Sequence, residues 1–412
     1  MTNEERKLVF EKVEHLVRTK YFDPHFNGRN WPDLVRRHRP DILAVTDDQV
    51  FEGGINALLG ELGTSHTRFF SPQTKVPSRS SLNATFRAVA TESGRRWAFQ
   101  DVQPGGPADR AGIKPSDLLI AVDNEEIRPP ANPEFQMNSS SSLTVIHGNG
   151  ASRTVSFAVD TPRPKYSDCP YAEPRNIVAS ILENRTGYLK IAMFPGIIGV
   201  EFAREVDKAI QSLGECDRLI IDLRGNPGGG IGGLRLMSYL VPDKRPVGYS
   251  LTRSRAERGY RREDLPTLNR IPDQKWKLPF LALRFLGRDL SIAVVTEGLG
   301  PQPFHGRMVV LVNEHTAGAA EMVAGFVQEN GLGRVLGTKS AGRLLGGKGF
   351  DVGHDYTLMI PIGAYLTWGG RRFEGSGVQP EVEIDWSWEQ AEAHRDVQYQ
   401  GAIETVTRLG RP

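Results

Sequence analysis

Cysteine is scarce in this chain, which has only Cys169 and Cys216 among its 412 residues. Two cysteines do not make the framework of several disulfides that stabilises small secreted domains. The cysteines and histidines also do not fall in a spacing that resembles a zinc site. We therefore expect neither a metal ion nor another cofactor.

Long apolar runs and a strong net charge are lacking as well. No stretch approaches the roughly 20 apolar residues that span a bilayer, and the first residues, MTNEERKLVF, contain no apolar core of a signal peptide. The net charge is only +2, which gives no indication of a nucleic-acid partner. The expectation is a cytoplasmic protein without a membrane span, or a periplasmic or secreted one if a leader has been removed.

The composition that remains is that of a globular protein, with 39% hydrophobic and 24% charged residues, and the length suits two or three domains. Residues 1–75 are expected to form a helical cap. Its first helix is predicted over residues 2–20, where Thr2 and Glu5 make a capping-box pattern. Further helices are expected from Trp31 and from Thr46, and the cap ends in a loop that contains His66.

Residues 81–160 change to short strands and turns. The segment from Val102 to Ile127, VQPGGPADRAGIKPSDLLIAVDNEEI, resembles the centre of a PDZ domain. Such domains bind a peptide as an added β-strand and capture its terminal carboxylate. The region that corresponds to the carboxylate loop, residues 82–86, lacks the usual glycines, so peptide capture by this domain is left open.

Residues 175–385 are predicted to form an α/β core, after a proline-rich linker at 161–174. Strands are expected at 188–191, 218–223, 308–312, 335–337 and 356–360 of one sheet, with helices between several of them. An insertion at 250–305, basic and partly apolar, is either a solvated excursion or a lid or partner surface. A closing helix is expected within 386–412. The fold class is thus α/β (α+β) and multidomain.

The sequence from Met308 to Gly347 contains the most informative turn. A run of β-formers stops at Thr316, Ala317 and Gly318, and an apolar-periodic helix follows. A strand that turns sharply into a helix exposes the turn residue and directs the helix N-terminus at whatever binds there. That geometry suits a nucleophile beside an oxyanion site, yet the turn residue is Gly318, which has no side chain.

A second glycine-rich turn follows the strand at 218–223. Its pattern, Gly228-x-Gly230-x-x-Gly233, formally matches a dinucleotide fingerprint. The acidic residue expected about 20 positions further on is missing. We therefore favour the other interpretation, in which glycines let backbone N–H groups approach a ligand oxygen, as an oxyanion hole requires.

Four segments occur in a fixed order along the chain: GELGTSHT at 60–67, the PDZ-like insert, LIIDLRGNPGG at 219–229 and VLVNEHTAGAAE at 310–321. In this order they resemble the carboxy-terminal processing (tail-specific) serine peptidases and the tricorn protease core. The resemblance covers about residues 20 to 385. It implies a helical cap, a PDZ domain and a crotonase-like α/β core.

The resemblance also implies the catalytic residues. One arrangement in the family is a Ser-Lys dyad, but the lysine position holds Arg343, which stays protonated and cannot act as a base. The other arrangement is the Ser-His-Glu triad of the tricorn core, which matches His66 and Glu374, with Ser65 beside the histidine. The implied oxyanion donors are the backbone N–H groups of Gly228 or Gly229 and of Ala319.

The family serine corresponds to Gly318, and three hypotheses remain open. The chain carries a Ser→Gly change in an otherwise competent peptidase, or it is a natural non-catalytic homologue that binds peptides, or another hydroxyl, of Thr316 or Ser340, substitutes. We assign Arg343 and Thr316 to substrate binding. The expected function is a serine peptidase acting on an extended polypeptide near its C-terminus; the alternatives are a peptide-binding pseudopeptidase or adaptor and, less favoured, a hydrophobic-ligand carrier.

Overall fold

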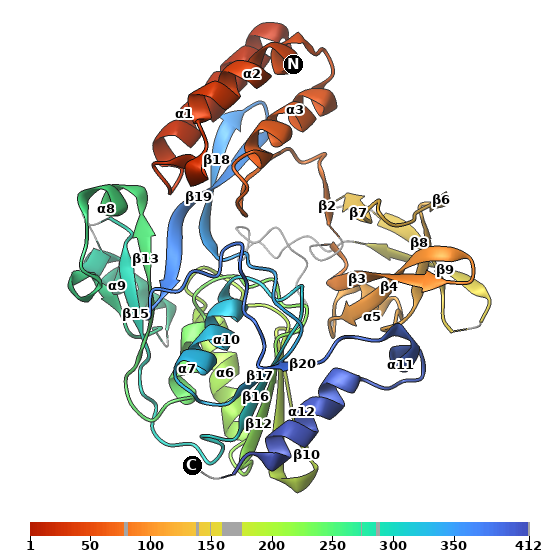
Figure 1. Ribbon diagram of the computed structural model, residues 1–412, viewed down its shortest axis with the longest axis vertical. Coiled ribbons are helices and arrows are strands. Elements are labelled where there is room, and N and C mark those ends of the chain that lie inside the picture. Colours follow the sequence, from red (N-terminus) through yellow and green to blue (C-terminus); the bar gives the residue numbers. More distant parts are fainter. Residues whose placement is uncertain are drawn as a thin grey trace.

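The fold was analysed in a computed structural model, which describes residues 1–77, 81–136, 140–148, 150–158, 175–272, 274–285 and 289–410. The helical cap stands at one end, the PDZ-like domain lies to one side, and the α/β core forms the opposite end (Figure 1). The linker at 161–174 and Cys169 lie outside the described residues, whereas Cys216 is a buried free thiol. None of the helices in the described ranges is both long and apolar enough to cross a bilayer.

The cap consists of helices that pack their apolar faces on one another and on a hairpin of the core. They are α1 (Asn3–Lys20), η1 (Phe26–Gly28), α2 (Trp31–Ala44) and α3 (Asp48–Gly60). The predicted capping box is confirmed, because the side chains of Thr2 and Glu5 each accept a hydrogen bond from the other's backbone N–H. The third helix is capped by Asp47 rather than started at Thr46, since the Asp47 carboxylate accepts from two N–H groups of the first turn.

The PDZ-like domain is an antiparallel sheet with strand order β3-β4-β5-β8-β9 and β6 paired to β5. The strands alternate buried and partly exposed residues, so that one face forms a small core of its own. A separate pairing of β2 with β7 joins the end of the cap to this domain. The elements are β2 (Lys75–Pro77), β3 (Ala84–Thr91), β4 (Gly94–Val102), α5 (Pro107–Arg110), β5 (Leu118–Val122), β6 (Glu125–Glu126), β7 (Glu134–Gln136), β8 (Ser140–Ile146) and β9 (Ser152–Ala158).

The core is built on a sheet with strand order β10-β11-β12-β16-β17-β20, parallel except for the β10–β11 pair. Both faces are covered, which explains the apolar runs in the central strands, at 219–221 in β12 and 308–312 in β16. In β12, Leu219 and Ile221 face the cluster of α6, α7 and α10, while Ile220 faces α12. The elements are β10 (Ile177–Leu182), η3 (Glu183–Arg185), β11 (Thr186–Ile191), α6 (Val200–Ser212), β12 (Arg218–Asp222), α7 (Gly233–Tyr239), β16 (Met308–Val312), α10 (Ala319–Glu329), β17 (Arg334–Gly337), β20 (Val382–Glu383) and α12 (Val397–Arg408).

Residues 356–360 do not continue this sheet, so that prediction was wrong. They begin β19 (Tyr356–Thr367), which pairs with β18 (Leu345–Gly353) in a long antiparallel hairpin and belongs to a second sheet, β1-β19-β13-β15-β14. The physical reason is the turn at His354 and Asp355, both at positive φ, which reverses the chain. The hairpin rises from the core to pack against the cap (Figure 1). The remaining strands are β1 (Arg68–Phe70), β13 (Pro246–Thr252), β14 (Thr267–Leu268) and β15 (Ile292–Val295).

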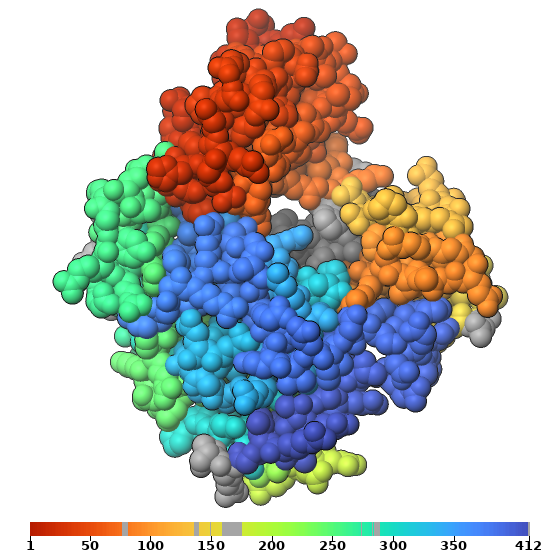
Figure 2. Space-filling view, in the orientation of Figure 1, coloured from red at the N-terminus to blue at the C-terminus, as the bar shows by residue number. Residues whose placement is uncertain are grey.

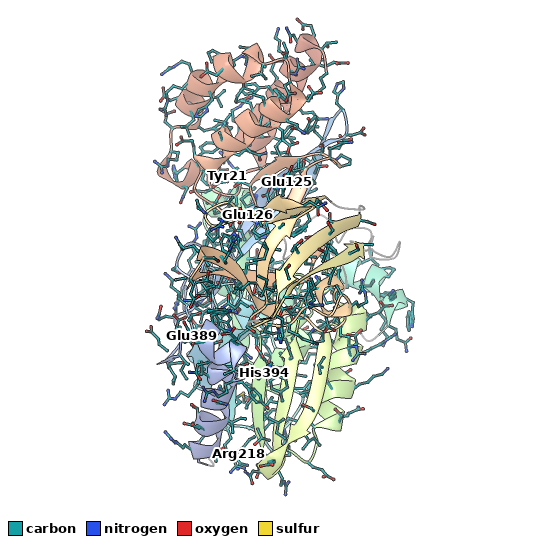
Figure 3. The ribbon with its side chains drawn as sticks, turned by 90° about the vertical axis from the view of Figure 1, so that its right-hand side faces the viewer. Tyr21, Glu125, Glu126, Arg218, Glu389 and His394 are labelled. Atoms are coloured by element: carbon teal, nitrogen blue, oxygen red, sulfur yellow. The ribbon has the colours of Figure 1, made fainter. Side chains whose placement is uncertain are left out.

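The expected insertion at 250–305 contributes β14, β15 and the last three residues of β13 to the second sheet. Its helical parts lie on the outer side of that sheet: α8 (Arg253–Arg258), η4 (Arg262–Asp264), η5 (Lys275–Lys277) and α9 (Leu278–Phe285). The single closing helix is divided into α11 (Trp388–Glu392) and α12, because His394 adopts positive φ and Asp396 caps a new helix. Figure 3 shows His394 beside α11, next to the PDZ-like domain.

Candidate active site

The loop after α3 places His66 at the base of the cap. Its conformation is fixed from the cap side: Tyr21 Oη lies 2.9 Å from Thr64 Oγ1, and Thr67 Oγ1 donates to the Thr64 carbonyl at 2.8 Å. Tyr21 is seen at the lower end of the cap in Figure 3. His66 itself has a φ of 60°, which is uncommon for a residue with a side chain. The hydrogen bonds of Thr64 and Thr67 hold the loop, and thereby the imidazole of His66, in this position.

Ser65 connects His66 to Glu374, 309 positions away in the chain from the serine. Ser65 Oγ lies 2.8 Å from His66 Nδ1 and donates to Glu374 Oε2 at 2.9 Å, while the Ser65 backbone N–H donates to Glu374 Oε1 at 2.7 Å. A hydroxyl has one proton, so with that proton on the carboxylate side its oxygen accepts from Nδ1–H. This places the proton of a neutral ring on Nδ1 and leaves Nε2 as a proton acceptor.

The electrostatics keep the imidazole neutral. Burial lowers the pKa of His66 below its usual value of 6.5, the Glu374 carboxylate opposes this shift, and the nearby Arg343 guanidinium adds to it. By accessible surface His66 is an exposed residue, but its ring packs closely on Gly347, where a Cβ would lie 3.0 Å from His66 Cδ2. A neutral imidazole with a free Nε2 is the protonation state that a general base needs.

The strand–turn–helix predicted around Gly318 is confirmed: β16 ends at Val312 and α10 begins at Ala319. We call residues 313–318 the elbow. Gly318 has φ 58° and ψ −126°, a conformation that L side chains rarely adopt. A Cβ added there would lie 3.3 Å from Gly228 Cα and 3.4 Å from the Pro227 carbonyl oxygen, so a serine would fit with small shifts of its neighbours.

Glu321, which the sequence analysis did not single out, holds the elbow in place. Its buried carboxylate accepts four hydrogen bonds, from Gly318 N–H at 2.9 Å, Ser340 Oγ at 2.6 Å, Gly342 N–H at 2.7 Å and Arg343 N–H at 3.0 Å. Burial raises the pKa of Glu321, and the four donors oppose that shift. Its position in the first turn of α10, three residues after Gly318, is the sequence signal that could have identified it.

Residues 340–344, here called the bridging loop, join the two halves of the site. At one end Glu321 binds the N–H groups of Gly342 and Arg343, and at the other the Leu344 N–H donates to Glu374 Oε2 at 2.9 Å. The elbow and the His66–Ser65–Glu374 group are therefore positioned by the same short segment.

Residues 225–230, the glycine strip, run beside the elbow. A Cβ on Gly228 would lie 2.8 Å from both the Ala317 oxygen and the Ala319 nitrogen, so only glycine fits there. The Gly228 N–H donates to Asn226 Oδ1 at 2.8 Å and is therefore engaged within the strip. The N–H groups of Gly229 and Ala319 have no protein acceptor among the described residues. These two remain as candidate oxyanion donors, and we do not retain Gly228.

The two hydroxyls considered as substitute nucleophiles are both engaged in hydrogen bonds within the protein. Thr316 is fully buried; its Oγ1 donates to the Leu223 carbonyl and accepts from Asn313 N–H, each at 2.9 Å. Ser340 Oγ donates to Glu321 and accepts from the Val378 N–H, at 2.6 Å in each case. Neither hydroxyl is oriented toward a substrate, and for the same reason we do not retain Thr316 as a substrate contact. Arg343 has an exposed side chain near His66.

The PDZ-like domain contacts the elbow and the glycine strip directly. Asn313 Nδ2 donates to Asp101 Oδ2 at 2.8 Å, and Asn313 Oδ1 accepts from Gly225 N–H at 2.9 Å. The buried Gln103 donates to the Arg224 carbonyl at 3.2 Å. The PDZ-like domain, which lies outside the core, therefore helps to position the glycine strip. Figure 2 shows an opening between the cap, this domain and the core.

A buried ion network fixes the strip from the other side. Asp222, at the end of β12, receives hydrogen bonds from Arg224 Nε at 3.0 Å and Nη2 at 2.7 Å, and Tyr188 Oη donates to it at 2.7 Å. These partners hold the pKa of Asp222 below its usual range despite complete burial. Arg224 also donates to Asp396 at the start of α12, at 2.9 Å. Within the described residues, no cluster of His, Cys, Asp and Glu could hold a metal ion.

Comparison with known proteins gives matches over the core and over the PDZ-like domain. The model of a family described as Peptidase family S41 matches residues 185–384, and that of a PDZ domain matches residues 99–133. The chain is 24% identical to a carboxyl-terminal-processing protease of Picosynechococcus sp., over 98% of this chain and 92% of that protein. It is 23% identical to tricorn protease homolog 1 of Streptomyces coelicolor, over 97% of this chain and 35% of that protein.

Solved structures show the same fold. A photosystem II D1 C-terminal processing protease superposes with a TM-score of 0.55 at 19% identity, covering 100% of this chain and 98% of the other. The s499a mutant of CPAF gives a TM-score of 0.60 at 14% identity, with 99% of each chain covered. The matches and the fold define the class as that of the serine-peptidase homologues with an α/β core and a PDZ domain. The α/β core of the chain, residues 185–384, matches peptidase family S41, as the resemblance implied.

Proposed function

We propose that the site binds an extended polypeptide and is built to hydrolyse it through an acyl-enzyme, with position 318 as the place of the nucleophile. One observation carries this proposal. The relay from Glu374 through Ser65 to His66 leaves Nε2 as the acceptor, and this arrangement has a use only if a proton is to be removed. A site for binding alone does not require a defined histidine tautomer.

The proposed roles follow from the contacts. His66 acts as general base and then as general acid for the leaving amine. Ser65 and Glu374 orient the ring and stabilise its protonated form. The N–H groups of Gly229 and Ala319, which have no protein acceptor among the described residues, donate to the developing oxyanion. Arg343 provides an exposed cation for a substrate carboxylate, which fits cleavage near a C-terminus.

The chain with Gly318 is expected to be nearly inert. Without one triad member, catalysis falls to a residual of roughly 10³–10⁴ over water, which comes from binding and the oxyanion site. Neither Thr316 nor Ser340 offers a free hydroxyl. Peptide binding without efficient cleavage is therefore the second candidate function, and the φ of 58° at Gly318, which suits glycine, favours it.

The test compares the chain as it stands, a Gly318→Ser variant and a Gly318→Ser/His66→Ala double variant on an unstructured polypeptide. We expect cleavage by the serine variant alone, together with its covalent labelling by a serine-directed fluorophosphonate. If the serine variant folds and binds the polypeptide but neither cleaves it nor labels, the peptidase assignment for this site is wrong. If the unaltered chain already cleaves, another nucleophile is present.

A further inference from the structure

Asn226 lies where the carboxyl ends of three parallel strands meet. It follows β12, which pairs with β11 on one side and with β16 on the other; β12 and β16 are seen side by side in Figure 1. The Asn226 Nδ2 group donates to the carbonyl of Ile191, the last residue of β11, at 2.8 Å. The Asn226 backbone carbonyl accepts from the N–H of Ala317, in the elbow after β16, at 2.8 Å. Asn226 therefore joins both neighbouring strands at the edge of the sheet where the site lies.

The carboxamide of Asn226 is engaged at both ends. The residue is fully buried, and its Oδ1 accepts from the Gly228 N–H at 2.8 Å while Nδ2 binds the Ile191 carbonyl. Because a buried carboxamide is costly unless it is hydrogen-bonded, these two bonds hold the side chain in one orientation. The first half of the glycine strip is thereby tied to the end of β11.

The hydrogen bonds around Gly228 determine the direction of the Gly229 N–H. The Gly228 N–H is held by Asn226, and the Gly228 carbonyl accepts from the Phe194 N–H at 2.9 Å. In a trans peptide, a carbonyl and the N–H of the next residue point in opposite directions. The Gly229 N–H therefore points away from the Phe194 backbone, and it has no protein acceptor among the described residues.

The other candidate oxyanion donor, the Ala319 N–H, is directed in the same way. The Gly318 carbonyl accepts from the N–H groups of Glu321 at 2.9 Å and Met322 at 3.2 Å, so it points into α10. The Ala319 N–H therefore points out of the N-terminal end of this helix, where the helix dipole favours negative charge. The bond from the Ala317 N–H to the Asn226 carbonyl joins this end of the helix to the glycine strip.

We propose that Asn226 is the positioning residue of the oxyanion site. Its side chain sets the direction of the Gly229 N–H through Gly228, and its carbonyl holds the elbow, and with it the Ala319 N–H, beside the strip. This inference rests on the proposed function, because the oxygen that the two donors bind becomes negative when a nucleophile at position 318 adds to a peptide carbonyl. Asn226 is fully buried and does not itself contact the substrate.

Kinetics in the Gly318→Ser background test the proposal, with active sites counted by fluorophosphonate labelling. Asn226→Ala removes both side-chain bonds, so we expect kcat to fall by roughly a hundredfold, the lower end of the cost of one lost oxyanion donor, with KM within about twofold. Asn226→Ser keeps a hydroxyl that can accept from the N–H two residues later, and it is expected to recover part of the loss. The matched control is Ser291→Ala beside the second sheet, which also removes a buried acceptor of a backbone N–H, that of Thr252 at 2.9 Å, and leaves kcat unchanged.

A peptide aldehyde separates positioning from stability. Its adduct with the introduced serine is tetrahedral and places an oxygen in the oxyanion site, whereas the parent peptide binds without such an oxygen. Asn226→Ala is expected to weaken binding of the aldehyde by the same factor as kcat, and binding of the peptide by no more than about twofold. Equal weakening of both ligands, or a kcat equal to that of the Ser291→Ala control, overturns the inference while the Gly318→Ser variant remains active.

Hydrogen exchange in the chain with Gly318 needs no catalysis. Asn226→Ala is expected to speed exchange in peptides that cover residues 225–230 and 313–319, relative to Ser291→Ala, and unchanged protection of both segments overturns the inference. If the Gly318→Ser variant is inactive although exchange responds as expected, the proposed function is wrong, and the oxyanion role of Asn226 is wrong with it.

Discussion

Replacing Glu321 by glutamine measures how firmly the elbow and the bridging loop are joined. Each carboxylate oxygen accepts two hydrogen bonds, Oε1 from Ser340 and Gly342 and Oε2 from Gly318 and Arg343. In Glu321→Gln an NH2 group replaces one oxygen, so two buried donors lose their acceptor. A buried donor left without a partner costs about 1–3 kcal/mol, which gives roughly 4 kcal/mol for the pair.

The assay is hydrogen exchange at the amides of Gly342 and Arg343, followed by mass spectrometry of peptides that cover the bridging loop. Since each 1.4 kcal/mol is a factor of ten, the loss predicts exchange faster by roughly a thousandfold. The control is Glu329→Gln at the exposed end of the same helix, where a change within about 0.5 kcal/mol is expected. Protection of the bridging loop that is equal in the two variants would refute the role of Glu321 as the joining residue.

Two further predictions concern the Gly318→Ser variant. Because burial lowers the pKa of His66, the neutral base persists as pH falls below 6.5 and is lost only below its lowered pKa; the acidic limb of kcat/KM therefore has its midpoint below 6.5. Arg343→Gln removes a charge that lowers this pKa, so it shifts the limb to higher pH, and an unshifted limb would contradict the assignment. In the same background, Asp101→Ala loosens the contact of the PDZ-like domain with the elbow and lowers kcat by about tenfold or more, with KM little changed. A rise in KM alone would show instead that Asp101 serves substrate binding.

Local patterns in the sequence predicted most elements but not all of their partners. The capping box at Thr2 and the buried strand β12 follow from short-range rules, and both are observed. The strand at Tyr356 was found, but its sheet was assigned wrongly, because a single apolar run does not show which neighbour it pairs with. The partner is decided by the turn at His354 and by packing against the cap, which are tertiary effects.

The site was predictable only in part for a related reason. Nothing in composition or spacing joins His66 to Glu374, and their pairing came from the resemblance to the peptidase family. The structure adds that Ser65 lies between them and bonds to both. Thr316 was assigned to substrate binding, whereas in the structure its hydroxyl donates to the carbonyl of Leu223, directly after β12. The glycine pattern also does not show which backbone N–H groups already have an acceptor. Gly228, whose N–H donates to Asn226 Oδ1, was therefore grouped with Gly229.

The conformation of Gly318 connects the stability of the elbow with its chemistry. A residue with a side chain at a φ near 58° costs on the order of 1–3 kcal/mol, and a catalytic serine at this position would have to bear that strain. Glycine releases the strain, while the contacts that would support a serine, the four hydrogen bonds of Glu321 and the relay through Ser65, are still present. These contacts hold the turn independently of the residue at 318. The elbow can therefore accept a serine without rebuilding, and we expect the Gly318→Ser variant to gain activity and lose stability together.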